Sequence, residues 1–265
     1  MRVLFFCPRW GSEALSWPDF LEKVKAAGYD GVEWAIPNNT TSEEIDAVQQ
    51  MAAKSHLLLI AQHYETNDSD FNRHFQAYGS WIEKVKAFPW EKINSQTGKD
   101  YFSYAQNTAL IKLAGKGVVH ETHRGKFSFS AHGTKYYLET IADLRLTLDA
   151  SHWVNVAESF LEDQQAILEL AISRADHIHA RVGYPEGPQV PDPRAVEWQA
   201  AVGIHLAWWD KVLALKRAEP DSVLTITPEF GPYPYMVEHP HSRKPVSNQW
   251  DINVYMMNLL KKRYV

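Results

Sequence analysis

Short apolar runs alternate along the chain with longer stretches whose hydrophobic positions recur at helical spacing. The short runs are rich in Val, Ile and Leu and lack strict alternation, which is typical of strands buried on both faces of a parallel sheet. The strands predicted in this way are Val3–Cys7, Gly31–Ile36, Leu57–Gln62, Glu91–Ser95, Val118–Thr122, Leu144–Asp149, His177–Val182 and Val223–Thr227.

Helices are predicted between these strands from apolar stripes and from capping residues. Two stripes with spacings of three and four residues are Phe71, Phe75, Tyr78, Ile82 and Val85, and then Val202, Leu206, Trp209 and Leu213. Ser16 and Thr41 each precede an acidic residue by three positions, which indicates helix starts. Gly28 and Gly115 stand where helices are expected to end, because a left-handed residue is needed there.

Eight strand–helix units repeat at intervals of roughly 30 residues, which predicts an α/β fold of the (β/α)8 TIM-barrel type. We expect a single domain over residues 1–265, because no flexible linker divides the chain. An open doubly wound sheet has the same alternation, but no Gly-x-Gly-x-x-Gly follows the first strand. The segment Gly183–Pro193 holds four prolines and is a candidate lid or substrate wall. The amphipathic segment Asn253–Val265 is expected to close the barrel or to form a homo-oligomer contact.

Composition narrows the class of protein. Hydrophobic residues make up 45% of the chain and charged residues 22%, which excludes a disordered chain. The net charge is -5 and the only basic block is Lys261-Lys262-Arg263, so neither nucleic acid nor a membrane is an expected partner. The single cysteine, Cys7, fits a reducing compartment, and no apolar run reaches membrane-spanning length. These features together predict a cytoplasmic protein.

Polar residues gather where the last four predicted strands end. The carboxyl ends of barrel strands open on one face, so these side chains are expected to converge. The candidates are Glu121 and His123, then Asp149 and His152, then His177, His179 and Arg181, and finally Glu229. Converging carboxylates repel one another unless a cation lies between them, and a mixed oxygen and nitrogen set suits one divalent ion, whether Mn, Mg, Co, Zn or Fe. Taken alone, however, Glu121 would be a surface residue, Asp149 a helix cap and one histidine a core residue.

Four short motifs resemble those of the xylose isomerase-like TIM-barrel superfamily, which includes the sugar phosphate isomerase/epimerase family. They are GYDGVEW at residues 28–34, Asp149-x-x-His152, HIHAR at residues 177–181 and PEFG at residues 228–231. The resemblance implies that Glu121, Asp149, His179 and Glu229 bind the metal and that His152 contacts the substrate. The family's sugar epimerases place an arginine where this chain has Pro185, and Arg181 is the candidate replacement.

The resemblance implies proton transfer next to a carbonyl of a sugar or polyol-type substrate, by isomerisation, epimerisation or dehydration. Glu121 and Glu229 would exchange protons with carbon, His152 would hold or relay a hydroxyl proton, and the metal would stabilise the enediolate. Residues expected to bind substrate are His123, Arg124, Arg181, Trp10, Glu33, His63 and Trp153, with Trp34, Phe230 and Tyr233 as further aromatic candidates. Two alternatives stay open, a metal-dependent hydrolase of the endonuclease IV type and a barrel that only binds a ligand. The fourth strand supplies no histidine for a three-metal nuclease centre, which counts against the hydrolase.

Overall fold

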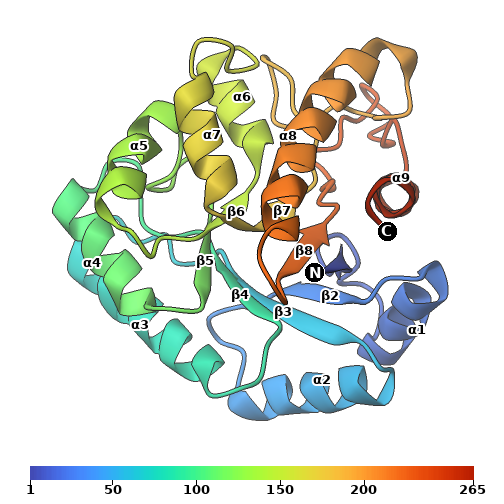
Figure 1. Cartoon of the computed structure of the whole chain (residues 1–265). Coiled ribbons are helices and arrows are strands. Elements are labelled where there is room, and N and C mark those ends of the chain that lie inside the picture. The colour runs from blue at the N-terminus through green and yellow to red at the C-terminus, as the bar shows by residue number, and fades with distance from the viewer.

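The computed structural model describes residues 1–265, and its eight parallel strands close into one barrel surrounded by helices (Figure 1). Each strand pairs with its neighbours in chain order, and β8 pairs with β1. The strands are β1 (Arg2–Pro8), β2 (Gly31–Ala35), β3 (Leu58–His63), β4 (Lys92–Ser95), β5 (Val118–Glu121), β6 (Leu146–Leu148), β7 (Ala175–His179) and β8 (Val223–Thr227). The predicted TIM barrel is therefore confirmed.

The helices pack around this barrel, and most strands are followed by one of them. They are α1 (Trp17–Ala27), α2 (Ser42–Lys54), α3 (Phe71–Lys86), α4 (Tyr104–Ala114), α5 (Ala131–Thr140), α6 (Ala150–Ala157), α7 (Gln165–Ser173), α8 (Gln199–Arg217) and α9 (Gln249–Tyr264). Two helices, α6 and α7, join β6 to β7. No helix in the structure is both long and apolar enough to cross a membrane.

Local sequence signals explain where several helices begin and end. The side chain of Thr41 accepts a hydrogen bond from the backbone N–H of Glu44, whose carboxylate accepts one from the N–H of Thr41, so α2 starts with a capping box. The side chain of Ser16 caps α1 by accepting a hydrogen bond from the backbone N–H of Asp19. Helix α1 ends at Gly28, whose φ of +90° is the left-handed conformation that the sequence pattern indicated.

The predicted boundaries of two strands differ from the observed ones by two residues or more. β7 begins at Ala175 and ends at His179, so the apolar residues that follow it, such as Val182, lie buried in a loop and not in the sheet. β6 is only three residues long, and its register with β7 shifts between Leu146 and Thr147. Apolar content alone does not separate a strand from the buried loop that continues it.

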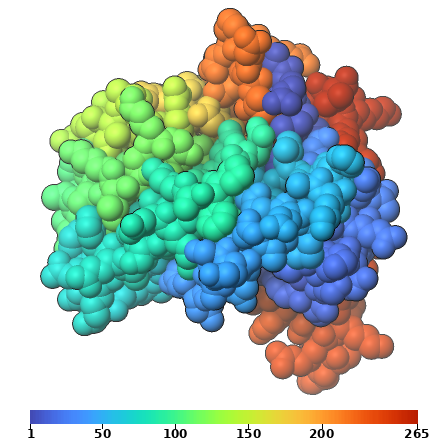
Figure 2. All heavy atoms as spheres, turned by 90° about the horizontal axis from the view of Figure 1, so that it is seen from below, coloured from blue at the N-terminus to red at the C-terminus, as the bar shows by residue number.

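The last helix completes the helical layer over the junction between the first and last strands. Ile252, Met256, Met257 and Leu260 of α9 are buried, and the helix packs against β1. The predicted use of the C-terminal segment in closing the barrel is therefore confirmed. The exposed part of the segment between β8 and α9, around residues 239–245, projects from the body of the molecule (Figure 2).

Candidate metal centre

Four side chains converge at the carboxyl ends of the last four strands. Glu121 is the last residue of β5, Asp149 follows β6, His179 is the last residue of β7, and Glu229 lies two residues after β8. One ligand atom from each lies within 4.8 Å of the others, and all four side chains are buried. The structure thus brings together the four residues that the motifs implied.

The donor atoms of this group fit a divalent cation. Both carboxylate oxygens of Glu121 and the Nδ1 atom of His179 are buried and have no hydrogen-bond partner. His179 Nδ1 lies 3.0 Å from Glu229 Oε2 and 3.5 Å from Glu121 Oε1. Buried polar atoms are nearly always paired, so unpaired atoms facing one another indicate a place for a further group. Carboxylate oxygens with one imidazole nitrogen are ligands that Mn, Zn, Fe and Co accept.

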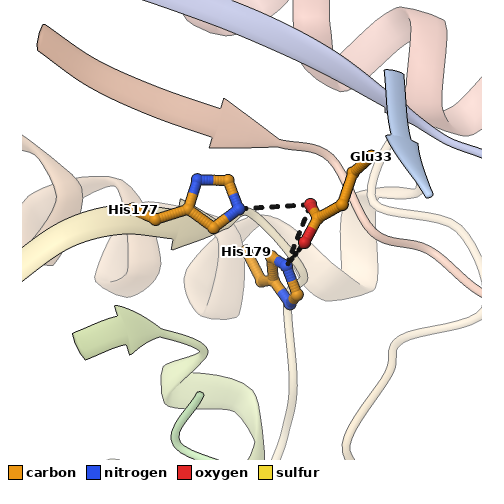
Figure 3. A group of neighbouring side chains, drawn as sticks. All are labelled: Glu33, His177 and His179. Atoms are coloured by element: carbon orange, nitrogen blue, oxygen red, sulfur yellow. Dashed lines mark hydrogen bonds and ion pairs between the residues drawn. The ribbon is translucent and has the colours of Figure 1, made fainter. Parts of the chain in front are cut away.

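The other nitrogen of His179 is held by Glu33, which comes from the second strand (Figure 3). His179 Nε2 lies 3.0 Å from Glu33 Oε1, and His177 Nε2 lies 3.1 Å from Glu33 Oε2. Asn94 and Thr227 donate to the same carboxylate, so its oxygens are fully used. A carboxylate that accepts the Nε2–H bond fixes the ring and leaves Nδ1 free to bind a metal. Glu33 is therefore a positioning residue beneath the centre.

Arg181 places a positive charge beside two of the carboxyl groups of the centre. Its Nη2 atom pairs with Asp149 Oδ2 and lies 3.3 Å from Glu229 Oε2. The same nitrogen lies 2.9 Å from His152 Nε2. One guanidinium does not balance the three buried carboxylates of Glu121, Asp149 and Glu229, so a further cation would stabilise the group.

The pKa values of the side chains in the centre are shifted by burial and by their charged neighbours. Burial alone would lower the pKa of His179, but the surrounding carboxylates, Glu229 first, raise it well above its ordinary value. Burial raises the pKa of Asp149 although Arg181 opposes the change. Burial would also raise the pKa of Glu229, but His179 and Arg181 lower it overall. The electrostatics favour positive charge at the point where the four side chains meet.

Two further histidines stand beside the centre in neutral form. The rings of His123 and His152 lie 4.0 Å apart, centre to centre. Burial lowers the pKa of His123 to about 3 and that of His152 well below its ordinary value. His152 Nδ1 has no hydrogen-bond partner. Since Arg181 Nη2 donates to its Nε2, His152 offers Nδ1–H as a donor to a bound molecule.

The centre opens into a cavity of about 780 Å³. Of the residues predicted to bind substrate, Trp10, His123 and Arg181 line it, together with Glu229 and Trp34. Five lining residues were not predicted from the sequence: Gln62, whose amide donates to Glu229 Oε1 over 3.0 Å, and Arg9, Tyr64, Gln96 and Tyr235. Gln62 and Tyr64 lie at the end of a predicted strand, so their position was a usable signal. Tyr235 lies in an irregular segment that gives no such signal.

The other predicted contact residues lie away from the cavity, each held by protein groups. Glu33 is bonded beneath His179, and His63 is buried against Thr66 and Ser95. Trp153 is fully buried, and its Nε1–H donates to the carbonyl of Ser128. The remaining predicted residues do not line the cavity either: Arg124 donates to Asn155, Phe230 is buried, Tyr233 is exposed, and no residue of Gly183–Pro193 is in the lining.

The loop after β7 is instead fixed to the neighbouring loop. Gln189 accepts a hydrogen bond from the N–H of Gly231 at 2.7 Å and donates to its carbonyl at 3.2 Å. The N–H of Val190 also donates to the carbonyl of Val182. The segment predicted as a lid or substrate wall is therefore bonded to the loop after β8 and does not line the cavity in this structure.

Comparison with known proteins gives a fold but no family assignment. No protein-family model matches the sequence, and no curated protein matches it. Endonuclease IV from Thermus thermophilus is similar in structure, with a TM-score of 0.57 and 13% identity over 99% of this chain and 98% of that one. D-psicose 3-epimerase has a TM-score of 0.53 and 10% identity over 99% of both chains. AP endonuclease, family 2, from Brucella melitensis has a TM-score of 0.54 and 10% identity over 96% of this chain and 98% of that one.

These similarities extend over nearly the whole length of each chain, so the full barrel is shared. The shared fold is the eight-stranded parallel TIM barrel that the alternation of strands and helices predicted. Because identities near 10% do not carry an activity from one protein to another, function has to be argued from the site.

Proposed function

We propose that the chain is a divalent-metal-dependent isomerase or epimerase that acts on a sugar or sugar derivative by proton transfer next to a carbonyl. The observation that carries this proposal is the pair of unpartnered Glu121 oxygens, fully buried beside the free Nδ1 atom of His179. A protein that did no chemistry here would gain stability from pairing or replacing them. One of the similar structures, D-psicose 3-epimerase, belongs to this reaction class.

The site residues divide the work as follows. A divalent ion held by Glu121, Asp149, His179 and Glu229 would polarise the substrate carbonyl and make the adjacent C–H acidic. Glu121 and Glu229 come from non-adjacent strands, so one carboxylate removes the proton and the other returns it. Return to the same carbon from the opposite side is epimerisation, whereas return to the neighbouring carbon is isomerisation. His152 holds a substrate hydroxyl through Nδ1.

Metal analysis and isotope exchange test the proposal together. The purified protein is expected to hold a divalent metal and to incorporate deuterium from heavy water next to the carbonyl of at least one sugar in a panel, followed by NMR. Glu121→Gln is expected to reduce exchange by about 10²–10⁴-fold, because an amide cannot take the proton. Glu139→Gln changes an exposed residue of α5 and serves as the control. A metal-loaded protein that exchanges no sugar, or equal exchange in Glu121→Gln, would refute the proposal.

A metal-dependent hydrolase is the second candidate, and one observation favours it. Glu121, His123 and His152 form another group whose ligand atoms lie within 4.8 Å of one another, next to the first. Two adjacent ions would activate water for phosphodiester cleavage, and two of the similar structures are endonucleases. This candidate predicts more than one metal per chain and cleavage of DNA without deuterium exchange into sugars. The net charge of -5 does not favour a DNA substrate.

A further inference from the structure

The cavity above the candidate metal centre extends outside the barrel. Along β2 the side chains alternate, so Glu33 points into the barrel while Trp34 points outward toward the helices. Trp34 nevertheless lines the same cavity as Glu229 and Arg181. The cavity therefore passes over the end of β2 and continues between the barrel wall and two helices. This outer limb is formed by Trp17 of α1, Trp34 of β2, and Ala47, Val48 and Met51 of α2.

The outer limb has apolar and largely aromatic walls. The rings of Trp17 and Trp34 meet edge to face at 5.1 Å, and Ala47, Val48 and Met51 face them with aliphatic groups. Protein interiors normally fill such space with side chains, because an unfilled apolar cavity forfeits packing energy. An apolar chamber that stays open and joins a polar reaction centre is the usual form of a site for a ligand with two chemically different ends.

The charges near the limb select against an anionic ligand. Glu13, Glu44 and Arg9 line it, and the ammonium of Lys84 lies beside it, bonded to the carbonyls of Asn38 and Thr40. Arg9 makes no ion pair; its guanidinium lies over the rings of Trp17 and Phe20 at 4.7 and 4.5 Å. Its Nη2 donates to the carbonyl of Leu15 at 2.6 Å. Both cations are held by aromatic rings or backbone carbonyls, so the limb offers no free cation to a phosphate, and the part of the ligand that occupies it is uncharged.

We infer that the substrate is not a free sugar or a sugar phosphate but a sugar-type compound that carries an uncharged aryl substituent, which occupies the outer limb. The inference rests on the proposed function only for placing the sugar part at the metal centre. The volume supports it, because about 780 Å³ lies in the upper part of the range for pockets that bury drug-sized ligands, and a free hexose is much smaller. Trp17 and Trp34 would stack against the ring of the substituent.

Binding of matched glycosides tests the inference without turnover. Phenyl and methyl glycosides of several hexoses are titrated into the Mn²⁺-loaded protein, and Kd is measured by calorimetry together with tryptophan fluorescence. The phenyl member of at least one pair is expected to bind about tenfold or more tightly than the methyl member, because burying the ring removes apolar surface from water. The fluorescence is expected to change more with the phenyl member than with the methyl member, since Trp17 and Trp34 lie in the limb.

A substitution that fills the limb locates the effect. Ala47 is an exposed helix residue at the wall, so Ala47→Trp is expected to fold and to abolish the phenyl preference while leaving methyl glycoside binding unchanged. Ala47→Leu is a milder second variant, expected to weaken the preference. Ala53→Trp lies on the same helix but outside the cavity and is the matched control.

The outcomes separate this inference from the proposed function. Equal binding of phenyl and methyl members in every pair, or a phenyl preference that survives Ala47→Trp, overturns the inference even when free sugars exchange deuterium. A phenyl preference lost in Ala47→Trp and kept in Ala53→Trp supports the inference. That result stands even when no sugar exchanges deuterium, in which case the proposed reaction, and not the aryl subsite, is wrong.

Discussion

Arg181 is the residue at which the candidate metal centre and the substrate cavity meet. Its guanidinium pairs with Asp149 and lies near Glu229, two of the four proposed ligands, and the ring of Tyr235 lies 4.7 Å from it. A fixed cation that shares ligands with a metal both stabilises the carboxylates and competes with the ion for them. It also faces the cavity, where a planar guanidinium suits a carbonyl or hydroxyl oxygen of the substrate.

Arg181→Met is expected to make folding more dependent on metal. Without the guanidinium, Asp149 loses its buried partner, so the metal-free protein should lose about 3–5 kcal/mol of unfolding free energy. Added Mn²⁺ should raise the melting temperature of Arg181→Met more than that of the wild type, because no internal cation competes for Asp149 and Glu229. Thermal melts with and without chelator measure both effects. The control Arg194→Met removes the guanidinium from a partly exposed ion pair with Asp192. Little change in unfolding free energy is expected there. A metal-induced rise no larger than that of the wild type would contradict this account.

At the level of elements, a histidine on α8 holds the loop that follows β7. His205 Nδ1 lies 2.9 Å from the carbonyl of Ala201, and its Nε2 accepts a hydrogen bond from the N–H of Gly183 at 3.3 Å. Only the neutral ring makes both bonds, because protonated Nε2 cannot accept. Burial lowers the pKa of His205 to about 4 from the ordinary 6.5. The attachment of this loop to its helix is therefore sensitive to acid.

The wild-type protein should lose stability through His205 as the pH falls from 6.5 toward 4. In this window the unfolded chain binds a proton at His205 and the folded chain does not, so acid favours unfolding, by up to about 3 kcal/mol. His205→Gln removes the titration, and its unfolding free energy should vary less over the same range in urea melts at a series of pH values. His132→Gln, at an exposed position of α5, is the control. Parallel pH curves for the wild type and His205→Gln would show that the ring plays no such part.

At the level of the whole molecule, the barrel and the convergence of the four candidate ligands were predictable because each depends on a short local pattern. An apolar run predicts a strand, and parallel closure places residues such as Glu121 and Glu229 on one face. The side-chain directions within α6 were not predictable. Trp153, which follows His152 in this helix, was expected to contact substrate but lies in the core. Tyr235, and not Trp153, is an aromatic residue that lines the cavity. It comes from an irregular segment whose path no sequence pattern determines.

The outer limb was unpredictable for a different reason. Trp34 was predicted as a pocket residue from its place near the end of the second strand, but its side chain lies on the face of β2 opposite to Glu33. It lines the cavity only because α1 and α2 leave space beside it. Spaces of this kind depend on how separate helices pack on the sheet, which local patterns do not contain.

Closure of the barrel by α9 is a property of the whole fold and can be tested away from the site. Leu260 is fully buried, so Leu260→Ala should lower the unfolding free energy by about 2–5 kcal/mol, through lost burial and a residual cavity. Leu215→Ala on α8 removes the same atoms from a side chain that is 45% exposed and should change stability by less than about 0.5 kcal/mol. Denaturant melts measure both. Metal affinity of folded Leu260→Ala should equal that of the wild type, because α9 supplies no ligand to the centre. If Leu260→Ala weakened metal binding without affecting unfolding, α9 would be acting on the site and not on closure of the barrel.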